Sequence, residues 1–218
     1  MTTKYFDFIK DTFKKVTDPS YSPEYSAGLL DLYYSKKKFH EDYLHDSPKE
    51  SGKYFHFLKE AVKHSDVNIV FELGNREGMS TIAIWDSLRS NQELYTFDTV
   101  IDLRFVPEHV RDSSVFNFVH KDCLDEGKII EILGERKIDI LFSDTIHTFD
   151  QIQKEWNLYK NYLSDESMIF IDDIGLKDKN LITKEICESS DFDVDFFDSG
   201  KVLHSSGFGV YSLARKKY

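Results

Sequence analysis

The chain has 218 residues, a length that usually folds as one domain around a sizeable hydrophobic core. Its formal net charge of −11 at pH 7 would repel a phosphate backbone, so we expect no nucleic-acid partner. Two isolated cysteines, no signal-peptide pattern and no apolar run near the ~20 residues of a membrane span predict a soluble, cytoplasmic protein without a membrane partner.

The first part of the chain, residues 1–65, is predicted to form a helical cap packed on the main domain. Apolar residues recur at helical spacing in residues 5–13, 27–34 and 54–62, and prolines separate these segments. Four tyrosines of this region could cover a site, although packing on the main domain is the simpler interpretation. They are Tyr21, Tyr25, Tyr33 and Tyr34.

Residues 66–218 are predicted to form the main domain, in which short apolar runs and helical patterns alternate. Strands are expected at residues 67–74, 93–100, 115–122, 137–144 and 168–175, with helices at 78–90, 128–136, 149–164 and 181–189. This alternation is typical of βαβ units in an α/β fold with a mostly parallel, Rossmann-like doubly wound sheet. The chain ends with two successive strands, residues 192–200 and 207–217, which predict an antiparallel hairpin at the sheet edge.

The segment FELGNREGMST, residues 71–81, joins the end of the first strand to the start of a helix. Gly74 and Gly78 permit a tight turn close to a ligand, and a helix N-terminus offers free N–H groups. Asp98 ends the second strand, where an acid can accept both hydroxyls of a ribose. The spacing matches neither the dinucleotide-binding pattern GxGxxG nor the GK[ST] phosphate loop. A loop that carries Glu72 and no lysine suits a ligand with a cationic amino-acid end better than a pyrophosphate. An ordinary turn with a surface acid is the alternative.

Three carboxylates follow the fourth and fifth strands: Asp144 after the former, and Asp172 with Asp173 after the latter. Ligands of open α/β sheets bind beyond these strand ends, and three like charges need a cation or protons. Oxygen ligands favour Mg²⁺, Mn²⁺ or Ca²⁺. His147 lies just past Asp144, and its imidazole could act as a general base near neutral pH. The alternatives are a helix cap for Asp144, an ordinary loop histidine for His147 and a surface acid pair.

Together these segments resemble a known family. ELGNREGMS resembles the E-x-G-x-x-x-G-x-S first motif of class I S-adenosylmethionine (SAM)-dependent methyltransferases, and FDT and HKDC resemble their second and third motifs. The resemblance covers roughly residues 67–214 and implies a seven-stranded sheet with an antiparallel last strand. It implies a methionine site at the glycine loop, a ribose site at Asp98 and an adenine site at Asp122 with Cys123. The expected cofactor-binding residues are Glu72, Gly74, Asn75, Gly78, Ser80, Asp98, Asp122, Cys123 and Asp144.

The patterns D-x-x-H after the fourth strand and D-D after the fifth resemble the metal-dependent small-molecule O-methyltransferases of the macrocin O-methyltransferase type. By position, this resemblance implies Asp144, Asp172 and Asp173 as metal ligands. It also implies Asp144 and His147 as catalytic residues, with His147 as the general base. The chain departs from the pattern in DTIH and DDI, where a small residue and an aromatic residue commonly follow the acids. These departures bear on the identity of the substrate.

The expected function is therefore methyl transfer from SAM to a hydroxyl of a small molecule, such as a sugar or a natural-product intermediate, assisted by a divalent metal. The alternatives are a metal-independent N- or O-methyltransferase of the same fold and a non-catalytic cofactor-binding module. His204, Ser205 and Ser206 lie between the last two strands, where a substrate edge could lie, although a polar turn is the simpler interpretation. The sequence leaves the oligomeric state open, a homo-oligomer included.

Overall fold

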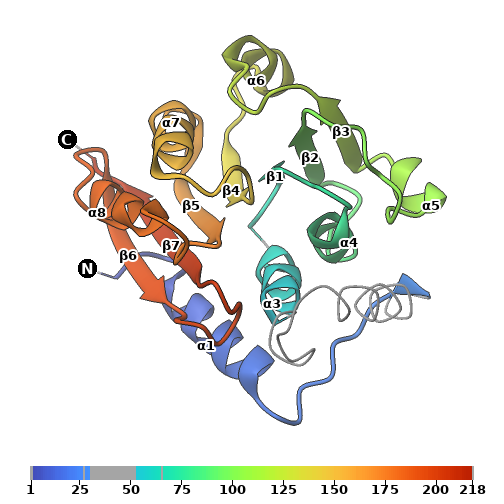
Figure 1. Cartoon of the computed structure of the whole chain (residues 1–218), viewed down its shortest axis with the longest axis horizontal. Coiled ribbons are helices and arrows are strands. Elements are labelled where there is room, and N and C mark those ends of the chain that lie inside the picture. Colours follow the sequence, from blue (N-terminus) through green and yellow to red (C-terminus); the bar gives the residue numbers. More distant parts are fainter. Residues whose placement is uncertain (1, 27, 30–52, 65, 218) are drawn as a thin grey trace.

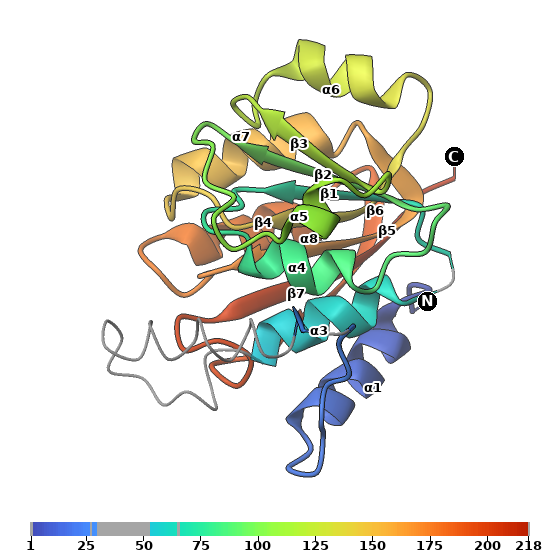
Figure 2. The same cartoon turned by 90° about the vertical axis from the view of Figure 1, so that its right-hand side faces the viewer.

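Seven strands form one sheet with helices on both faces (Figures 1 and 2). The structure is a computed structural model, and it describes residues 2–26, 28–29, 53–64 and 66–217. The strands are β1 Ile69–Leu73, β2 Glu93–Asp98, β3 Phe116–His120, β4 Ile138–Ser143, β5 Leu163–Asp172, β6 Phe192–Asp198 and β7 Phe208–Arg215. The helices are α1 Phe6–Thr17, α3 Lys53–Val62, α4 Met79–Trp85, α5 Glu108–Arg111, α6 Glu126–Leu133, α7 Phe149–Tyr159 and α8 Ile182–Cys187, with a 3-10 turn η1 at Lys179–Leu181.

The order of the strands across the sheet is β3-β2-β1-β4-β5-β7-β6. The pairs among β3, β2, β1, β4 and β5 are parallel, whereas β7 runs antiparallel to both of its neighbours, β5 and β6. The chain order reverses between β1 and β4, and this is where ligands of doubly wound sheets bind. The predicted Rossmann-like sheet with an antiparallel last strand is confirmed.

The central strands are buried on both faces because helices cover the sheet on either side. Along β1, the side chain of Val70 belongs to the core under α1, α3, α4 and α5, whereas Ile69 and Phe71 belong to the core under α6, α7 and α8. This alternation is the two-residue period of a strand, with an apolar residue required on each side. Figure 1 shows the two helix layers on opposite sides of the sheet. The sheet thereby presents only its strand ends to a ligand.

The described helices of the N-terminal region, α1 and α3, share the core on one face of the sheet. Helix α3 lies against α4, and α1 lies against α3, β6 and β7 (Figure 2). Phe57 of α3 packs edge-on against Phe170 of β5, with ring centroids 5.8 Å apart. The helices predicted over residues 5–13 and 54–62 are confirmed, while most of the one expected over 27–34 lies outside the described residues. The division of the chain near residue 65 stays a prediction.

The tyrosines considered as a possible cover for the site bond to α3 where they are described. The Tyr21 hydroxyl donates to Glu60 at 3.0 Å, and the Tyr25 hydroxyl lies 3.1 Å from His56 Nδ1. Tyr33 and Tyr34 lie outside the described residues. The described pair therefore fastens the N-terminal segment to α3 within the predicted cap, and both the packing of these tyrosines on the main domain and their role as a cover stay predictions.

Several element boundaries differ from those predicted. The helix expected over residues 149–164 ends at Tyr159, and the strand expected to begin at residue 168 begins at Leu163. The difference has a tertiary cause, because the chain returns to β4 there and Ile138 N–H donates to the carbonyl of Tyr162 at 2.9 Å. Helix α4 likewise ends at Trp85 rather than near residue 90. Among the described helices, none combines the length and the hydropathy that a bilayer crossing requires.

Candidate active site

The loop after β1 lies directly against the end of β4, and a glycine makes this approach possible. Gly74 has φ +81°, and a Cβ atom there would lie 2.2 Å from the backbone oxygen of Asp144. Its N–H donates to the Phe97 carbonyl at 2.8 Å, which holds the loop to β2 as well. Only glycine combines this left-handed backbone with such a close contact. Gly74 therefore brings the ends of β1, β2 and β4 together.

Asp98, at the end of β2, organises the same loop. Its Oδ2 accepts the backbone N–H groups of Asn75 and Arg76, each at 3.1 Å, and its Oδ1 accepts the N–H of Val100 at 2.9 Å. Arg76 adopts a left-handed φ of +48°, which turns its N–H towards this carboxylate. Three of the roughly four acceptor positions of the carboxylate are thereby used, and one is left for a ligand.

The side chain of Asn75 is buried in this loop without partners. It is 3 % exposed, and neither its Oδ1 nor its Nδ2 has a hydrogen-bond partner among the described residues. A buried polar group without a partner costs about 1–3 kcal/mol. Natural structures keep such groups where another molecule or a mechanism uses them, so Asn75 is a candidate ligand contact.

Glu72 and Ser80 point towards each other behind the loop. The buried Glu72 carboxylate accepts hydrogen bonds from the hydroxyls of Ser80 at 2.5 Å, Thr81 at 2.6 Å and Thr96 at 2.7 Å. Burial raises the pKa of Glu72, and the three hydrogen bonds oppose this rise. Because buried carboxylates need such donors, the pair supports the loop from behind, and direct contact of either residue with a cofactor stays a prediction.

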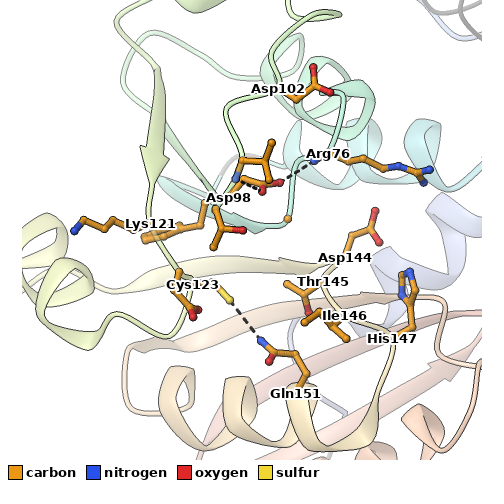
Figure 3. A pocket seen from close by; sticks show the side chains of 15 residues that line it. Arg76, Asp98, Asp102, Lys121, Cys123, Asp144, Thr145, Ile146, His147 and Gln151 are labelled. Atoms are coloured by element: carbon orange, nitrogen blue, oxygen red, sulfur yellow. Dashed lines mark hydrogen bonds between the residues drawn. The ribbon is translucent and has the colours of Figure 1, made fainter.

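A cavity of about 620 Å³ opens at the carboxyl ends of β1 to β4 (Figure 3). Its volume falls in the range of sites that enclose a small-molecule cofactor. The lining residues are Gly74, Arg76, Phe97, Asp98, Thr99, Val100, Asp102, Lys121, Asp122, Cys123, Asp144, Thr145, Ile146, His147 and Gln151. The expected cofactor residues at the strand ends are thus brought together here. Glu72, Asn75, Gly78 and Ser80 are not among the lining residues.

Gly78 and Cys123 have structural roles that the sequence does not reveal. Gly78 precedes α4 with φ +92°, and a Cβ atom there would lie 2.3 Å from Val106 Cγ2. The Cys123 side chain is buried, and burial raises the pKa of its thiol above the ordinary value. The thiol therefore stays protonated at neutral pH and is a poor nucleophile. Asp122 beside it is exposed, and its Oδ1 accepts the N–H of Leu124 at 2.9 Å.

The acids after β4 and β5 lie beside two histidines. His147 Nε2 lies 3.3 Å from Asp173 Oδ2, and His204 Nδ1 lies 3.1 Å from Asp172 Oδ1 and 3.2 Å from Asp173 Oδ1. Two overlapping groups could each hold a metal ion, with their ligand atoms within 4.8 Å of one another. They are Asp144 with His147 and Asp173, and Asp172 with Asp173 and His204. We call these five residues the carboxylate–imidazole cluster.

The composition of this cluster changes the expectation of oxygen ligands alone. His204 belongs to the connection between β6 and β7, for which the sequence predicts a polar turn or, as the alternative, a substrate edge, but no contact with the acids. The antiparallel pairing of β7 with β5 sets Asp172 opposite Phe208 and so brings this connection to the end of β5. Imidazole ligands suit transition metals such as zinc, copper, iron and nickel better than Mg²⁺ or Ca²⁺. Whether any metal binds stays a prediction.

The two histidines of the cluster differ in charge at neutral pH. Burial lowers the pKa of His147, and this outweighs the opposing charge of Asp173, so His147 is neutral. Burial would also lower the pKa of His204, but the carboxylates of Asp172 and Asp173 outweigh it and raise the pKa to about 10. His204 is therefore a cation. Burial and the charge of Asp172 raise the pKa of Asp144 well above its ordinary value.

A buried lysine lies behind the cluster. Lys179 of η1 is fully buried, and its Nζ donates to the backbone carbonyl of Asp172 at 2.7 Å. Its charge opposes the rise in the pKa of Asp144. Lys179 stands in the polar stretch GLKDKN, where a lysine normally indicates an exposed loop, so no signal in the sequence marks it.

Comparison with known proteins gives a match over the centre of the chain. A family model described as a methyltransferase domain matches residues 71–174, just under half of the 218 residues. The matched span runs from β1 to the residue after Asp173, and it includes the glycine loop and the three acids. No curated protein matches the chain.

Solved structures share the fold over almost the whole chain. The O-methyltransferase from Bacillus cereus in complex with SAH has a TM-score of 0.64 at 16% identity, covering 95% of this chain and 100% of that one. The SAH-bound methyltransferase from Podospora anserina has a TM-score of 0.65 at 12% identity, covering 100% and 99%. The O-methyltransferase TomG from Streptomyces achromogenes, involved in tomaymycin synthesis and in complex with SAM, has a TM-score of 0.63 at 11% identity, covering 98% and 100%. The chain therefore shares the fold of these methyltransferase structures, and its centre matches a methyltransferase-domain model.

Proposed function

We propose that the protein transfers the methyl group of SAM to a hydroxyl oxygen of a small molecule, such as a sugar or a natural-product intermediate. One observation carries the proposal: Asp144 and His147 line the cavity and also belong to the carboxylate–imidazole cluster. Figure 3 shows these two side chains at one end of the cavity, with Lys121 and Cys123 at the other. A methyl donor in the cavity and a hydroxyl at the cluster would therefore meet there.

Several features support SAM as the ligand of the cavity. The left-handed Gly74 and the acid at the end of β2 line one end of a cofactor-sized space, and the partnerless Asn75 side chain is buried in the same loop. Structures of the same fold are described as complexes with SAM or SAH. Methyl transfer asks the protein mainly for in-line placement of two reactants, which a rigid set of strand ends provides.

His147 is suited to the role of general base. It is neutral at pH 7, and the Asp173 carboxylate near Nε2 favours the tautomer that carries the proton on that nitrogen. Nδ1 is buried and has no hydrogen-bond partner among the described residues, and it would accept the proton of a substrate hydroxyl that reaches it. The oxygen lone pair forms the new bond to the methyl carbon as the carbon–sulfur bond breaks, and SAH leaves as a neutral thioether.

The cluster also fits a divalent cation. Asp172 Oδ1, Asp173 Oδ1 and His204 Nδ1 are buried and lack a well-aligned hydrogen-bond partner within the described part of the chain. Asp144, Asp172 and Asp173 would hold Mg²⁺, Mn²⁺ or Ca²⁺ through their carboxylate oxygens. When bound, the cation would act as a Lewis acid that lowers the pKa of the substrate hydroxyl.

A metal-independent methyltransferase of the same fold is the second candidate, and a specific observation favours it. The His204 cation lies beside the carboxylates of Asp172 and Asp173, and the charge of Lys179, which bonds to the backbone carbonyl of Asp172, acts on Asp144. Two positive charges can balance most of the negative charge that would otherwise require a metal ion. In that case Asp172 and Asp173 would have a structural role, and the acceptor could be a nitrogen as well as an oxygen.

The proposal is tested in two stages with the full chain. Calorimetry with SAH measures cofactor binding, for which we expect a micromolar dissociation constant. Methyl transfer is then followed as SAH release over a panel of hydroxylated sugars and phenols, with EDTA and with Mg²⁺ or Mn²⁺ added back. Loss of activity in EDTA and its return with the cation supports the metal-dependent form, whereas full activity in EDTA supports the second candidate.

Substitutions test the two assigned residues. We expect His147→Ala and Asp144→Ala to lower kcat by about 10² or more, because they remove a base and an orienting carboxylate. His109→Ala and Asp150→Ala are matched controls, since both residues are exposed and neither lines the cavity. Wild-type rates in the first pair would reject the roles of Asp144 and His147, and no binding of SAH would reject the proposed function itself.

A further inference from the structure

We propose that Gln151 recognises the exocyclic amino group of the adenine base, and that Glu155 is the positioning residue that fixes the Gln151 amide for this purpose. The inference rests on the proposed function, because it concerns the base of the methyl donor. It adds a specificity-determining residue on α7, a helix that carries none of the cofactor motifs quoted from the sequence.

Glu155 stands at the centre of a buried network beneath the cavity. Its side chain is 1 % exposed, and its carboxylate accepts hydrogen bonds from Ser143 Oγ at 2.6 Å, Thr145 Oγ1 at 2.5 Å and Gln151 Nε2 at 2.8 Å. Gln151 and Glu155 are four residues apart on α7, so they lie one above the other on the same helix face. Thr145 and Gln151 line the cavity, and Glu155 therefore fixes two of its wall residues.

The network determines which end of the Gln151 amide is available. A carboxylate accepts hydrogen bonds and donates none, so the amide must turn its Nε2 towards Glu155. The second N–H of Nε2 points to Cys123 Sγ, 3.7 Å away, as the dashed line in Figure 3 shows. Both amide donors are thus engaged inside the protein. The carbonyl Oε1 accepts no hydrogen bond from any described residue and is not among the buried polar atoms that lack partners. It is the atom left for a ligand.

Gln151 lies at the end of the cavity formed by Asp122 and Cys123. The backbone carbonyl of Cys123 already accepts the Tyr159 hydroxyl at 2.6 Å. Asp122 also offers an acceptor, but it is exposed, so water competes for its oxygens. The partly buried Gln151 carbonyl is better placed to discriminate, because a half-enclosed polar group left unpaired by the wrong ligand is costly. A 6-amino purine donates to it, whereas a 6-oxo purine presents a second acceptor.

The test compares SAH with its 6-oxo analogue, S-inosylhomocysteine, by calorimetry. We expect the wild-type chain to bind SAH at least about tenfold more tightly, the size of one lost hydrogen bond. Gln151→Leu should remove most of this preference by weakening the binding of SAH. Glu155→Gln should reduce the preference, because the side-chain amide of Gln151 can then flip and exchange its N–H and carbonyl ends. Gln153→Leu is the matched control: Gln153 lies on the same helix, donates to Glu185 at 2.5 Å and does not line the cavity.

The outcomes separate this assignment from the proposed function. If Gln151→Leu binds SAH and keeps the wild-type preference, the role of Gln151 is rejected while cofactor binding stands. The role is also rejected if Asp122→Asn alone abolishes the preference. If the wild-type chain fails to bind SAH, the proposed function is rejected and this inference with it. Thermal unfolding of each variant verifies that it is folded. If Glu155→Gln is not folded, the Gln151→Leu variant alone tests the role of Gln151.

Discussion

Two sides of the site are stabilised in different ways: the loop side, formed by Gly74 to Gly78 with Asp98, and the cluster side, formed by the carboxylate–imidazole cluster with Lys179. On the loop side, backbone N–H groups of Asn75 and Arg76 bind one aspartate, and a glycine permits a close backbone contact. On the cluster side, charged side chains from β4, β5, η1 and the β6–β7 connection neutralise one another. Backbone geometry fixes the first region, so its substitutions should act through sterics and be independent of pH. Electrostatics fixes the second, so its substitutions should depend on pH.

The largest expected effect is that of Gly74→Ala on the loop side. The new Cβ would lie 2.2 Å from the Asp144 backbone oxygen at φ +81°, so the contact between β1 and β4 must open. We expect a loss of about 3 kcal/mol in the free energy of unfolding and no measurable binding of SAH. Gly134→Ala is the control, because its φ is +56° and a Cβ there meets nothing within 4 Å. That variant should lose less, about 1–2 kcal/mol, from backbone strain alone. Equal losses in the two variants would contradict the steric explanation.

The next effect is that of His204→Gln, which should depend on pH. The pKa of His204 is raised from 6.5 to about 10, so its protonation stabilises the folded state. This contribution is fully present below pH 6.5 and is lost as the pH rises towards 10. We therefore expect the variant to lose about 2 kcal/mol at pH 6 and progressively less at higher pH. Urea unfolding of both proteins across this range measures the difference.

The exposed His109 provides the control for this pH dependence. His109→Gln should change the free energy of unfolding by less than about 0.5 kcal/mol at every pH. A difference between wild type and His204→Gln that stays constant from pH 6 to pH 10 would mean that the ion pairs with Asp172 and Asp173 do not stabilise the fold.

The smallest expected effect on stability is that of Asn75→Ala. This variant separates a residue of the loop that serves the ligand from Gly74, which serves the fold. Because both amide atoms lack partners, their removal should leave the free energy of unfolding within about 1 kcal/mol of the wild-type value. Binding of SAH should weaken about tenfold, since the ligand would supply those partners. Thermal unfolding and calorimetry measure the two quantities. A large loss of stability with unchanged affinity would show that Asn75 serves the fold instead of the ligand.

The sequence predicted the sheet because its signals are local. Apolar runs ending in Gly74, Asp98 and Asp144 mark strands, and the helical patterns between them impose parallel pairing. Since parallel strands end at one edge, the strand pattern alone places Asp144, Asp172 and Asp173 on a common rim. The ends of α4 and α7 were predicted less well, because tertiary contacts end these helices before their helical pattern of apolar residues ends.

The direction of each side chain was decided by tertiary structure. Glu72 and Ser80 belong to a motif that can be read along the chain, yet they point towards each other behind the loop. Lys179 stands in a polar stretch and is fully buried, and Gln151 has an amide that only the distant carboxylate network orients. Such placements depend on which donors and charges a buried group meets, and those partners come from other elements.

The sequence by itself determined the order of the strands and helices, the glycine loop and the rim where three acids meet. Only the tertiary structure decided that His204 and Lys179 join those acids, and that Gln151 lies at the cavity with its amide held by Glu155. The physical reason is one of range. Periodicity and strand ends act over a few neighbouring residues, whereas charge balance and hydrogen-bond satisfaction are settled among residues that only the folded chain brings within a few ångströms.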